Sequence, residues 1–218
     1  MQVWRQQKGP IVRKSGVLLV VSGPSGVGKG TVIERVLARH PEVARSVSCT
    51  TRRPRRGEQD GREYRFVSLE QFRHMVIAGE LLEYARVHQD LWYGTPRAPV
   101  EAALASGQDI TLEIDYQGAR SVRQLMGGRA VLVFVAPPSW QELVRRLEGR
   151  STESQEATAK RLDSARQEFK HIGMFEYLVV NDDLDEAVRQ LEAILMAERC
   201  RLSRTQWQQL QARLEEEQ

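Results

Sequence analysis

Short apolar runs alternate with amphipathic stretches along this chain, and this pattern predicts a parallel sheet with helices on both faces. Lys29–Arg39 has helical spacing, with Val32 and Val36 on one side. The runs that we expect to form strands are Val17–Val21, Arg45–Thr50, Asp109–Asp115, Ala130–Ala136 and Glu176–Asn181.

Several helix starts are marked by their polar residues. Ser68-x-x-Gln71 and Ser139-x-x-Glu142 have the pattern of a capping box. Thr95 precedes Pro96, which predicts a cap residue followed by a proline at the first helical position. From Leu184 to the end, no glycine or proline interrupts a helical pattern. We expect the tail after residue 200 to be a polar helix, which is either a solvated extension or a helix that binds a partner or self-associates.

Composition fits one domain with a sizeable core. The chain has 218 residues, of which 41% are hydrophobic. Mean hydropathy is −0.47, and the apolar runs are too short to span a bilayer. The basic N-terminus has no apolar signal region, so we expect a cytoplasmic protein without membrane contact. Cys49 and Cys200 have no metal-ligand spacing and predict neither a disulfide framework nor a zinc site.

A phosphate-binding loop follows the first expected strand. The segment has the Walker A form G-x-x-x-x-G-K between a strand and a helix. Its backbone N–H groups and the helix N-terminus would face an anion, and Lys29 would place a charge near the β- and γ-phosphates. The residues that we expect at the ATP site are Gly23, Pro24, Ser25, Gly26, Val27, Gly28, Lys29, Gly30 and Thr31.

One position of this loop departs from the usual motif. Gly30 stands where most such loops carry a Ser or Thr that binds Mg²⁺, and Thr31 comes one residue later. The Gly-Lys-Gly-Thr ending resembles that of adenylate kinases, in which water and phosphate oxygens hold most of the metal. We therefore expect Mg²⁺ as the cofactor but assign it no direct ligand.

The next segment is rich in arginine and carries the substrate information. Arg52 and Arg55 flank Pro54, and the planar guanidinium fork suits a phosphate group. Tyr64 could add a hydroxyl donor. The net charge is only +3, so a small phosphate-bearing ligand is a better partner for these arginines than nucleic acid.

Four motifs of this region closely resemble those of guanylate kinases. They are the run from Ser48 to Glu58, Gly61-x-x-Tyr64-x-Phe66, Glu83-x-Ala85 and Tyr93-Gly94-Thr95. The resemblance extends from about Gly16 to Glu198. It implies a three-layer α/β P-loop fold and Mg²⁺-dependent transfer of the γ-phosphoryl group from ATP to GMP, and dGMP is also expected as an acceptor.

The resemblance also implies which residues bind GMP. Arg52, Arg55, Tyr64 and Tyr93 would hold its phosphate, and Ser48, Glu83, Thr95 and Asp115 would surround its guanine. The chemistry agrees, because guanine presents N1–H and N2–H₂ donors on one edge and an ionised Glu83 only accepts. Adenine would leave that carboxylate unpaired, and such sites reject the wrong base strongly.

A strand end and a helical lid complete the expected site. Glu113 lies at the carboxyl end of the expected strand Asp109–Asp115 and could orient water around Mg²⁺. By resemblance, Arg146, Arg150 and Arg161 are lid arginines that join Lys29 in neutralising the transferred phosphoryl group. Asn181 would lie beside the adenine, or the polar run that it begins could simply cap the last helix.

The expected organisation is a core with two insertions and two extensions. The core would comprise residues 16–47, 96–140 and 172–199, the GMP lobe residues 48–95 and the lid residues 141–171. Residues 1–15 and 200–218 would be terminal extensions, and the protein would act as a monomer or homodimer. Two other activities share parts of the pattern, a kinase of sugar bisphosphates and a non-catalytic module that binds phosphopeptides.

Overall fold

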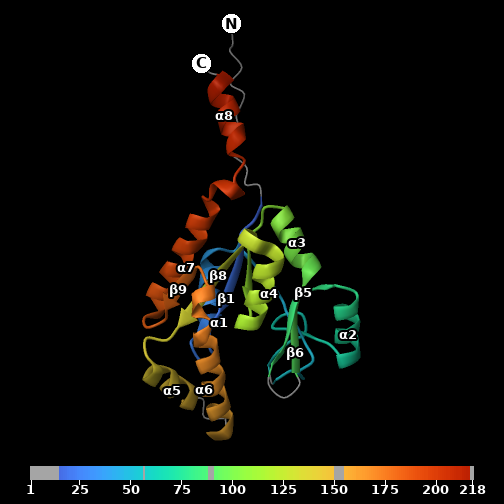
Figure 1. Ribbon diagram of the computed structural model, residues 1–218, viewed down its shortest axis with the longest axis vertical. Coiled ribbons are helices and arrows are strands. Elements are labelled where there is room, and N and C mark those ends of the chain that lie inside the picture. Colours follow the sequence, from blue (N-terminus) through green and yellow to red (C-terminus); the bar gives the residue numbers. More distant parts are fainter. Residues whose placement is uncertain (1–14, 56, 88–90, 150–154, 217–218) are drawn as a thin grey trace.

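A five-stranded parallel sheet forms the centre of the molecule (Figure 1). The computed structural model describes residues 15–55, 57–87, 91–149 and 155–216. The strand order is β2-β7-β1-β8-β9, and every neighbouring pair is parallel. The strands are β2 (Ala44–Arg45), β7 (Ile110–Glu113), β1 (Leu18–Ser22), β8 (Ala130–Ala136) and β9 (Tyr177–Val180).

Alternating side chains of β1 build a core on each face of this sheet. Leu19 and Val21 pack with α1 (Lys29–Arg39), α5 (Trp140–Glu148) and α7 (Leu184–Arg199). Leu18 and Val20 pack with α3 (Arg97–Ala105) and α4 (Tyr116–Met126) on the other face. Burial on both sides explains why the strands are continuous apolar runs. The predicted three-layer α/β fold is therefore confirmed.

A second, smaller sheet carries its own core. Its order is β4-β3-β6-β5, with only the β3–β4 pair parallel. Its elements are β3 (Cys49–Thr50), β4 (Arg65–Phe66), α2 (Leu69–Ile77), β5 (Leu81–Val87) and β6 (Leu91–Pro96). Cys49, Phe72 and Leu81 are buried at its centre. The predicted capping box begins α2. The side-chain oxygens of Ser68 and Gln71 each accept a hydrogen bond from the other residue's backbone N–H.

Two expected element boundaries are wrong. Arg45–Thr50 is not one strand, because the chain leaves the central sheet after Arg45 and enters the second sheet at Cys49. Thr95 is not a helix cap, because it lies in β6 and its hydroxyl binds Glu83. Pro96 occupies the N-cap of α3 instead.

The described part of residues 141–171, which are expected to form a lid, is helical. It contains α5 and α6 (Gln155–Lys170), which lie at the end of the molecule away from α8 (Figure 1). Ser139 caps α5 by accepting from the backbone N–H of Glu142. The Glu142 carboxylate binds Arg145 and Arg146, so the cap is one half of the expected box.

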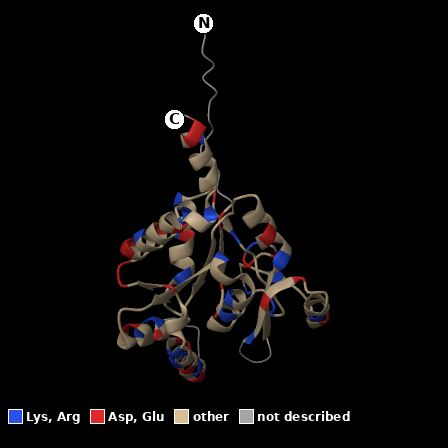
Figure 2. Cartoon of the chain, turned by 45° about the horizontal axis from the view of Figure 1, so that its top comes forward, with Lys and Arg blue, Asp and Glu red and all other residues tan. Residues whose placement is uncertain are grey.

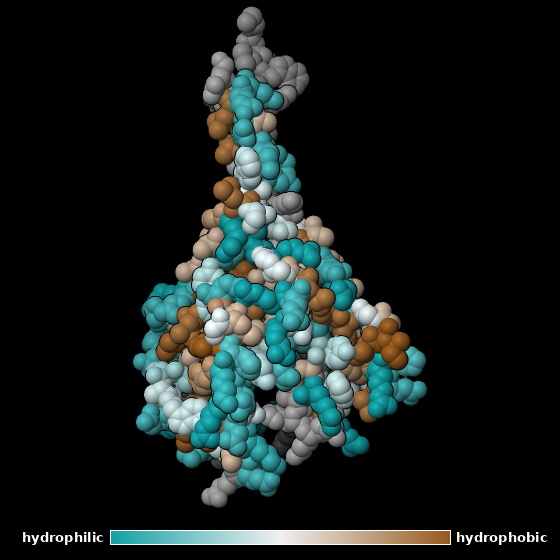
Figure 3. All heavy atoms as spheres, viewed as in Figure 1, coloured by the Kyte–Doolittle hydropathy of each residue, from teal (hydrophilic) through white to brown (hydrophobic). Residues whose placement is uncertain are grey.

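The C-terminal helix is interrupted, contrary to expectation. Between α7 and α8 (Trp207–Glu216) the chain makes a 3₁₀ turn, Leu202–Arg204, without glycine or proline. Arg204 is buried there and donates to Glu198 and to the carbonyl oxygens of Gly128 and Arg129. This tertiary contact ends α7. Beyond it, α8 protrudes as a narrow stalk with apolar positions exposed along it (Figure 3).

Charged residues lie mostly on the helices and loops around the central sheet (Figure 2). No helix of the described residues is long and apolar enough to cross a membrane.

Replacement of Arg204 tests the interruption. In Arg204→Met we expect the free energy of unfolding to fall by about 3 kcal/mol, because a buried ion pair loses one partner. Arg201→Met is the control, since Arg201 binds the same carboxylate but its side chain is half exposed; its cost should stay below about 1 kcal/mol. Urea unfolding measures both, and equal losses would contradict the buried role of Arg204.

Candidate active site

The loop between β1 and α1 packs closely against its neighbours. A Cβ at Gly23 would lie 2.1 Å from the carbonyl oxygen of Val135 in β8, and its φ is 139°. Gly28 has a φ of 88°, and a Cβ there would lie 2.5 Å from the side-chain nitrogen of Asn181. Only glycine fits both positions. The loop therefore presents its backbone to the pocket, as a phosphate cradle requires.

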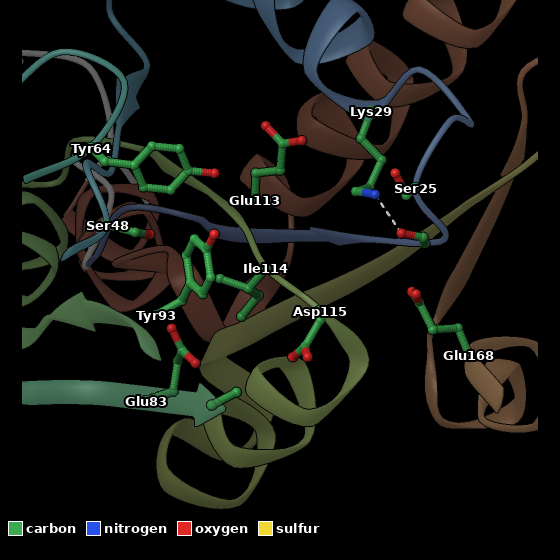
Figure 4. A pocket seen from close by; sticks show the side chains of 12 residues that line it. Ser25, Lys29, Ser48, Tyr64, Glu83, Tyr93, Glu113, Ile114, Asp115 and Glu168 are labelled. Atoms are coloured by element: carbon green, nitrogen blue, oxygen red, sulfur yellow. Dashed lines mark hydrogen bonds between the residues drawn. The ribbon is translucent and has the colours of Figure 1, made fainter. Parts of the chain in front are cut away.

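The N-terminus of α1 is prepared for an anion. The helix begins at Lys29 and has no acidic residue in its first turn and no side-chain cap. Its free N–H groups and dipole are therefore not neutralised from within the chain. The Lys29 ammonium donates to the carbonyl oxygens of Gly23 and Pro24, so it lies in the mouth of the loop (Figure 4).

Residues from three later segments hold this loop. Asn181, after β9, donates to the carbonyl oxygen of Val27 at 2.7 Å, whereas Asp183 caps α7. Arg146 of α5 donates to the carbonyl oxygen of Asn181 at 2.9 Å. Arg161 of α6 lies 3.0 Å from the Ser25 hydroxyl. Both α5 and α6 thus contact the phosphate loop or its partner directly; Arg150 lies outside the described residues.

A pocket opens between the phosphate loop, the second sheet and α6 (Figure 4). Its volume is about 280 Å³. It brings together residues expected at both substrates, with β6, the end of β7 and α6 supplying side chains from separate directions. The lining residues are Gly23, Ser25, Lys29, Ser48, Tyr64, Glu83, Ala85, Tyr93, Glu113, Ile114, Asp115 and Glu168.

Glu83 is a buried acid on β5. Its side chain accepts a 2.6 Å hydrogen bond from Thr95 on the neighbouring strand β6. Burial raises the pKa of Glu83 to about 7, with the Thr95 bond opposing the rise and Asp115 adding to it. A Cβ at Gly118 would lie 2.5 Å from a Glu83 carboxylate oxygen, so Gly118 leaves the space that this group occupies.

Two tyrosines form the opposite wall, and Arg52, which does not line the pocket, packs against one of them. The rings of Tyr64 and Tyr93 meet edge to face with centroids 5.7 Å apart. Burial, with Glu113 nearby, raises the pKa of Tyr64, so its hydroxyl stays a donor at neutral pH. Arg52 packs over the Tyr64 ring, and two bonds of 2.8 and 2.9 Å join its fork to Glu58. Arg55 is exposed, and its backbone N–H donates to Glu58.

Two carboxylates lie at the end of β7. Asp115 caps α4 by accepting from the Gly118 N–H at 2.8 Å. Glu113 lies 3.4 Å from the Arg45 guanidinium, and a Cβ at Gly30 would stand 3.6 Å from both of its oxygens. Within the described ranges, no three His, Cys, Asp or Glu side chains form a metal-binding group.

Ala85, Ile114 and Glu168 line this pocket without having been predicted as site residues. Gly118, which packs against Glu83, was not predicted either, and Gly118 and Glu168 are the more informative cases. Gly118 lies within the expected strand-end motif, but its spacing gives no sign that it touches Glu83. Glu168 lies on α6 among other charged residues, and no sequence signal separates it from a solvated one. Both depend on contacts between segments far apart in the chain.

The bond between Thr95 and Glu83 allows a direct test. In Thr95→Val the carboxylate loses a donor that stabilises its charged form, so the pKa of Glu83 should rise above about 7. Carbon-detected NMR titration of the glutamate carboxyls measures this pKa. Thr111→Val is the control, because that hydroxyl bonds the Ala44 carbonyl oxygen outside the pocket. An unchanged or lower pKa in Thr95→Val would contradict the assigned bond.

Comparison with known proteins agrees with this geometry. The guanylate kinase family model matches residues 15–198. A guanylate kinase of Nocardia farcinica is 51% identical over 185 residues, covering 84% of this chain and 95% of the relative. One of Paramagnetospirillum magneticum is 47% identical over 195 residues, covering 89% and 91%. The crystal structure of guanylate kinase from Anaplasma phagocytophilum has a TM-score of 0.76 and 36% identity, covering 90% of this chain and 93% of that one. Matched along most of its length by the family model and by these relatives, the chain belongs to the guanylate kinase family.

Proposed function

We propose that this chain performs the guanylate kinase reaction in the pocket between the phosphate loop, β5 and α6. The reaction transfers the terminal phosphoryl group of ATP to GMP and gives ADP and GDP. The observation that carries this assignment is the presence of Lys29, Tyr64 and Glu83 in one cavity. One cavity thereby offers a cation for the ATP phosphates, a hydroxyl for the GMP phosphate and a carboxyl for the guanine base.

Glu83 is the proposed reader of guanine. It accepts from N1–H and N2–H₂, while Ser48 and Asp115 line the same part of the pocket. Two donors at this carboxylate stabilise its charged form, so GMP binding lowers the raised pKa of Glu83. Thr95 contributes through its bond to Glu83, which orients the carboxylate.

Tyr64, Tyr93, Arg52 and Arg55 are the proposed contacts of the GMP phosphate. The two tyrosine side chains line the pocket, and Arg52 lies against the ring of Tyr64. The bonds from Arg52 to Glu58 leave other N–H groups of its fork for a phosphate oxygen. A hydroxyl and a guanidinium together bind the dianion without a covalent bond.

Catalysis then consists of alignment and neutralisation of charge. The GMP phosphate oxygen attacks the γ-phosphorus directly, so no covalent enzyme intermediate forms. Lys29 is held at the mouth of the loop, where its ammonium group stabilises the negative charge that develops on the transferred phosphoryl group. Arg146 and Arg161 reach the loop from α5 and α6, and Arg150 is assigned to the same set by resemblance. Closure of these helices excludes water that would hydrolyse ATP.

Mg²⁺ is the proposed cofactor. Glu113 is the residue that would orient its water shell, because its carboxylate lines the pocket beside Gly30 and the phosphate loop. Such a site suits an ion held largely by water and phosphate oxygens, and agrees with the glycine at position 30. When bound, the ion would neutralise charge on the ATP phosphates.

The organisation of the enzyme follows from this assignment. Residues 48–95 would act as the GMP lobe and residues 141–171 as the lid, since the pocket lies between them. We also propose a cytoplasmic enzyme that acts as a monomer or homodimer. dGMP should be accepted alongside GMP, and absence of its turnover where GMP reacts would refute this.

A comparison of acceptors tests the reaction and the base reading together. ADP release from ATP and Mg²⁺ is measured with GMP, AMP, CMP and UMP, and turnover is expected with GMP alone. Lys29→Ala should lower kcat by a factor of about 100 or more, because it removes a charge aimed at the transferred group. Turnover with another base would discard the role of Glu83, and no turnover in the folded protein would discard the kinase assignment.

Gly118→Ala tests the space reserved for Glu83. The added methyl group displaces the carboxylate, so KM for GMP should rise about tenfold, the loss of one hydrogen bond to a charged group. KM for ATP should not change. Gly128→Ala is the matched control, because a Cβ there meets nothing within 4 Å. Equal kinetics of the two variants would contradict the placement of Glu83.

A further inference from the structure

Glu168 carries a buried oxygen that the chain does not satisfy. Its Oε2 is shielded from solvent and has no hydrogen-bond partner among the described residues. The side chain lines the pocket from α6 (Figure 4). A carboxyl oxygen buried in this way is costly unless a donor reaches it.

In the part of the chain that the structure describes, no donor reaches this oxygen. Lys29 is the cation that acts on it electrostatically, but its ammonium is bonded to the Gly23 and Pro24 carbonyl oxygens. Asp115 faces it with a like charge. Burial raises the pKa of Glu168 to about 7, Lys29 opposes the rise and Asp115 adds to it. The group is thus ready for a ligand that suits a carboxyl in either charge state.

The chemistry of GMP leaves one class of group for this position. Its phosphate oxygens only accept and would repel an ionised carboxylate. Its guanine N–H donors are already assigned to Glu83, which enters from the second sheet. The ribose hydroxyls remain, and a hydroxyl can donate to a carboxylate or accept from a protonated carboxyl.

Position favours the same group. The ribose is joined directly to the base, so it must lie beside the guanine readers, which include Asp115. In Figure 4, Glu168 points into the pocket from the side away from Glu83, with Asp115 between them. Arg146 and Asn181, the residues proposed to act at ATP, bond each other and the phosphate loop and do not line this cavity. The sugar that Glu168 faces is therefore that of the acceptor.

We propose that Glu168 binds a ribose hydroxyl of GMP and so positions the acceptor against the phosphate loop. This role rests on the proposed function and adds a sugar contact to it. It also links the acceptor to the lid, because Glu168 and Arg161 are seven residues apart on one face of α6 and Arg161 contacts Ser25.

Deoxynucleotides and substitutions at position 168 together test the proposal. Values of kcat/KM are measured for GMP, 2′-deoxyGMP and 3′-deoxyGMP in the wild type and in Glu168→Met, which keeps the side-chain length but cannot bond a hydroxyl. Loss of one such bond should lower kcat/KM for GMP about tenfold. The deoxy acceptor that lacks the contacted hydroxyl should show no further loss in the variant.

Two variants control for folding and charge. Glu156→Met makes the same change on the same helix, where the carboxylate is exposed and pairs with Lys160, and should behave as the wild type. Glu168→Gln keeps hydrogen-bonding capacity without charge and should retain most of the GMP activity. Thermal unfolding of each variant confirms that it is folded.

The contrary outcomes are distinct. An equal loss for all three acceptors, or no loss with GMP, would overturn the sugar contact. A loss that disappears with 2′- or 3′-deoxyATP as donor would place the contact on the wrong nucleotide and overturn it as well. Glu168→Gln as impaired as Glu168→Met would also overturn it. The wild-type rate with GMP tests the proposed function separately, so a normal rate beside any of these results refutes only the role of Glu168.

Discussion

The backbone of the phosphate loop touches its neighbours so closely that two of its positions admit no side chain. Gly23 lies against the Val135 carbonyl oxygen of β8, and Gly28 lies against Asn181 after β9. These contacts determine the direction of the N-terminus of α1 and the position of the Lys29 backbone. They also place the loop within reach of α5 and α6, whose arginines bond Asn181 and Ser25. The geometry of the whole pocket therefore depends on backbone contacts that only glycine permits.

Local patterns predicted the elements that local forces determine. The bounds of α1 and β8 agree with the sequence pattern, because apolar spacing and the glycine loop define them within a few residues. The bend between Arg45 and Cys49 was missed because a change of sheet leaves no mark in residue type. The interruption after α7 was missed for a related reason. It depends on burial of Arg204 against residues about 75 positions earlier, a contact that no helix propensity encodes.

The site was predicted where a motif is long and missed where a single side chain acts through tertiary contact. Ser48, Tyr64 and Glu83 lie far apart in sequence yet line one cavity, as the family resemblance implied. The roles of Gly118 and Glu168 depend on tertiary packing. Gly118 lies against the Glu83 carboxylate, and Glu168 has a buried oxygen without a partner among the described residues. Buried acids of this kind destabilise the empty protein, and a ligand that supplies donors recovers that free energy on binding. Part of the binding free energy would therefore come from the donors that the ligand supplies to these acids.

Helix α6 carries opposite charges on one face. Under the proposed roles, Arg161 serves the phosphate loop while Glu168, two turns along α6, serves the acceptor sugar. A movement of this helix would displace both groups together, because a helix moves as a rigid element. The cation would then reach the transferred phosphoryl group only when the acceptor sugar is also held. Neutralisation of charge and positioning of the acceptor would be one event, and ATP would be protected from hydrolysis while GMP is absent.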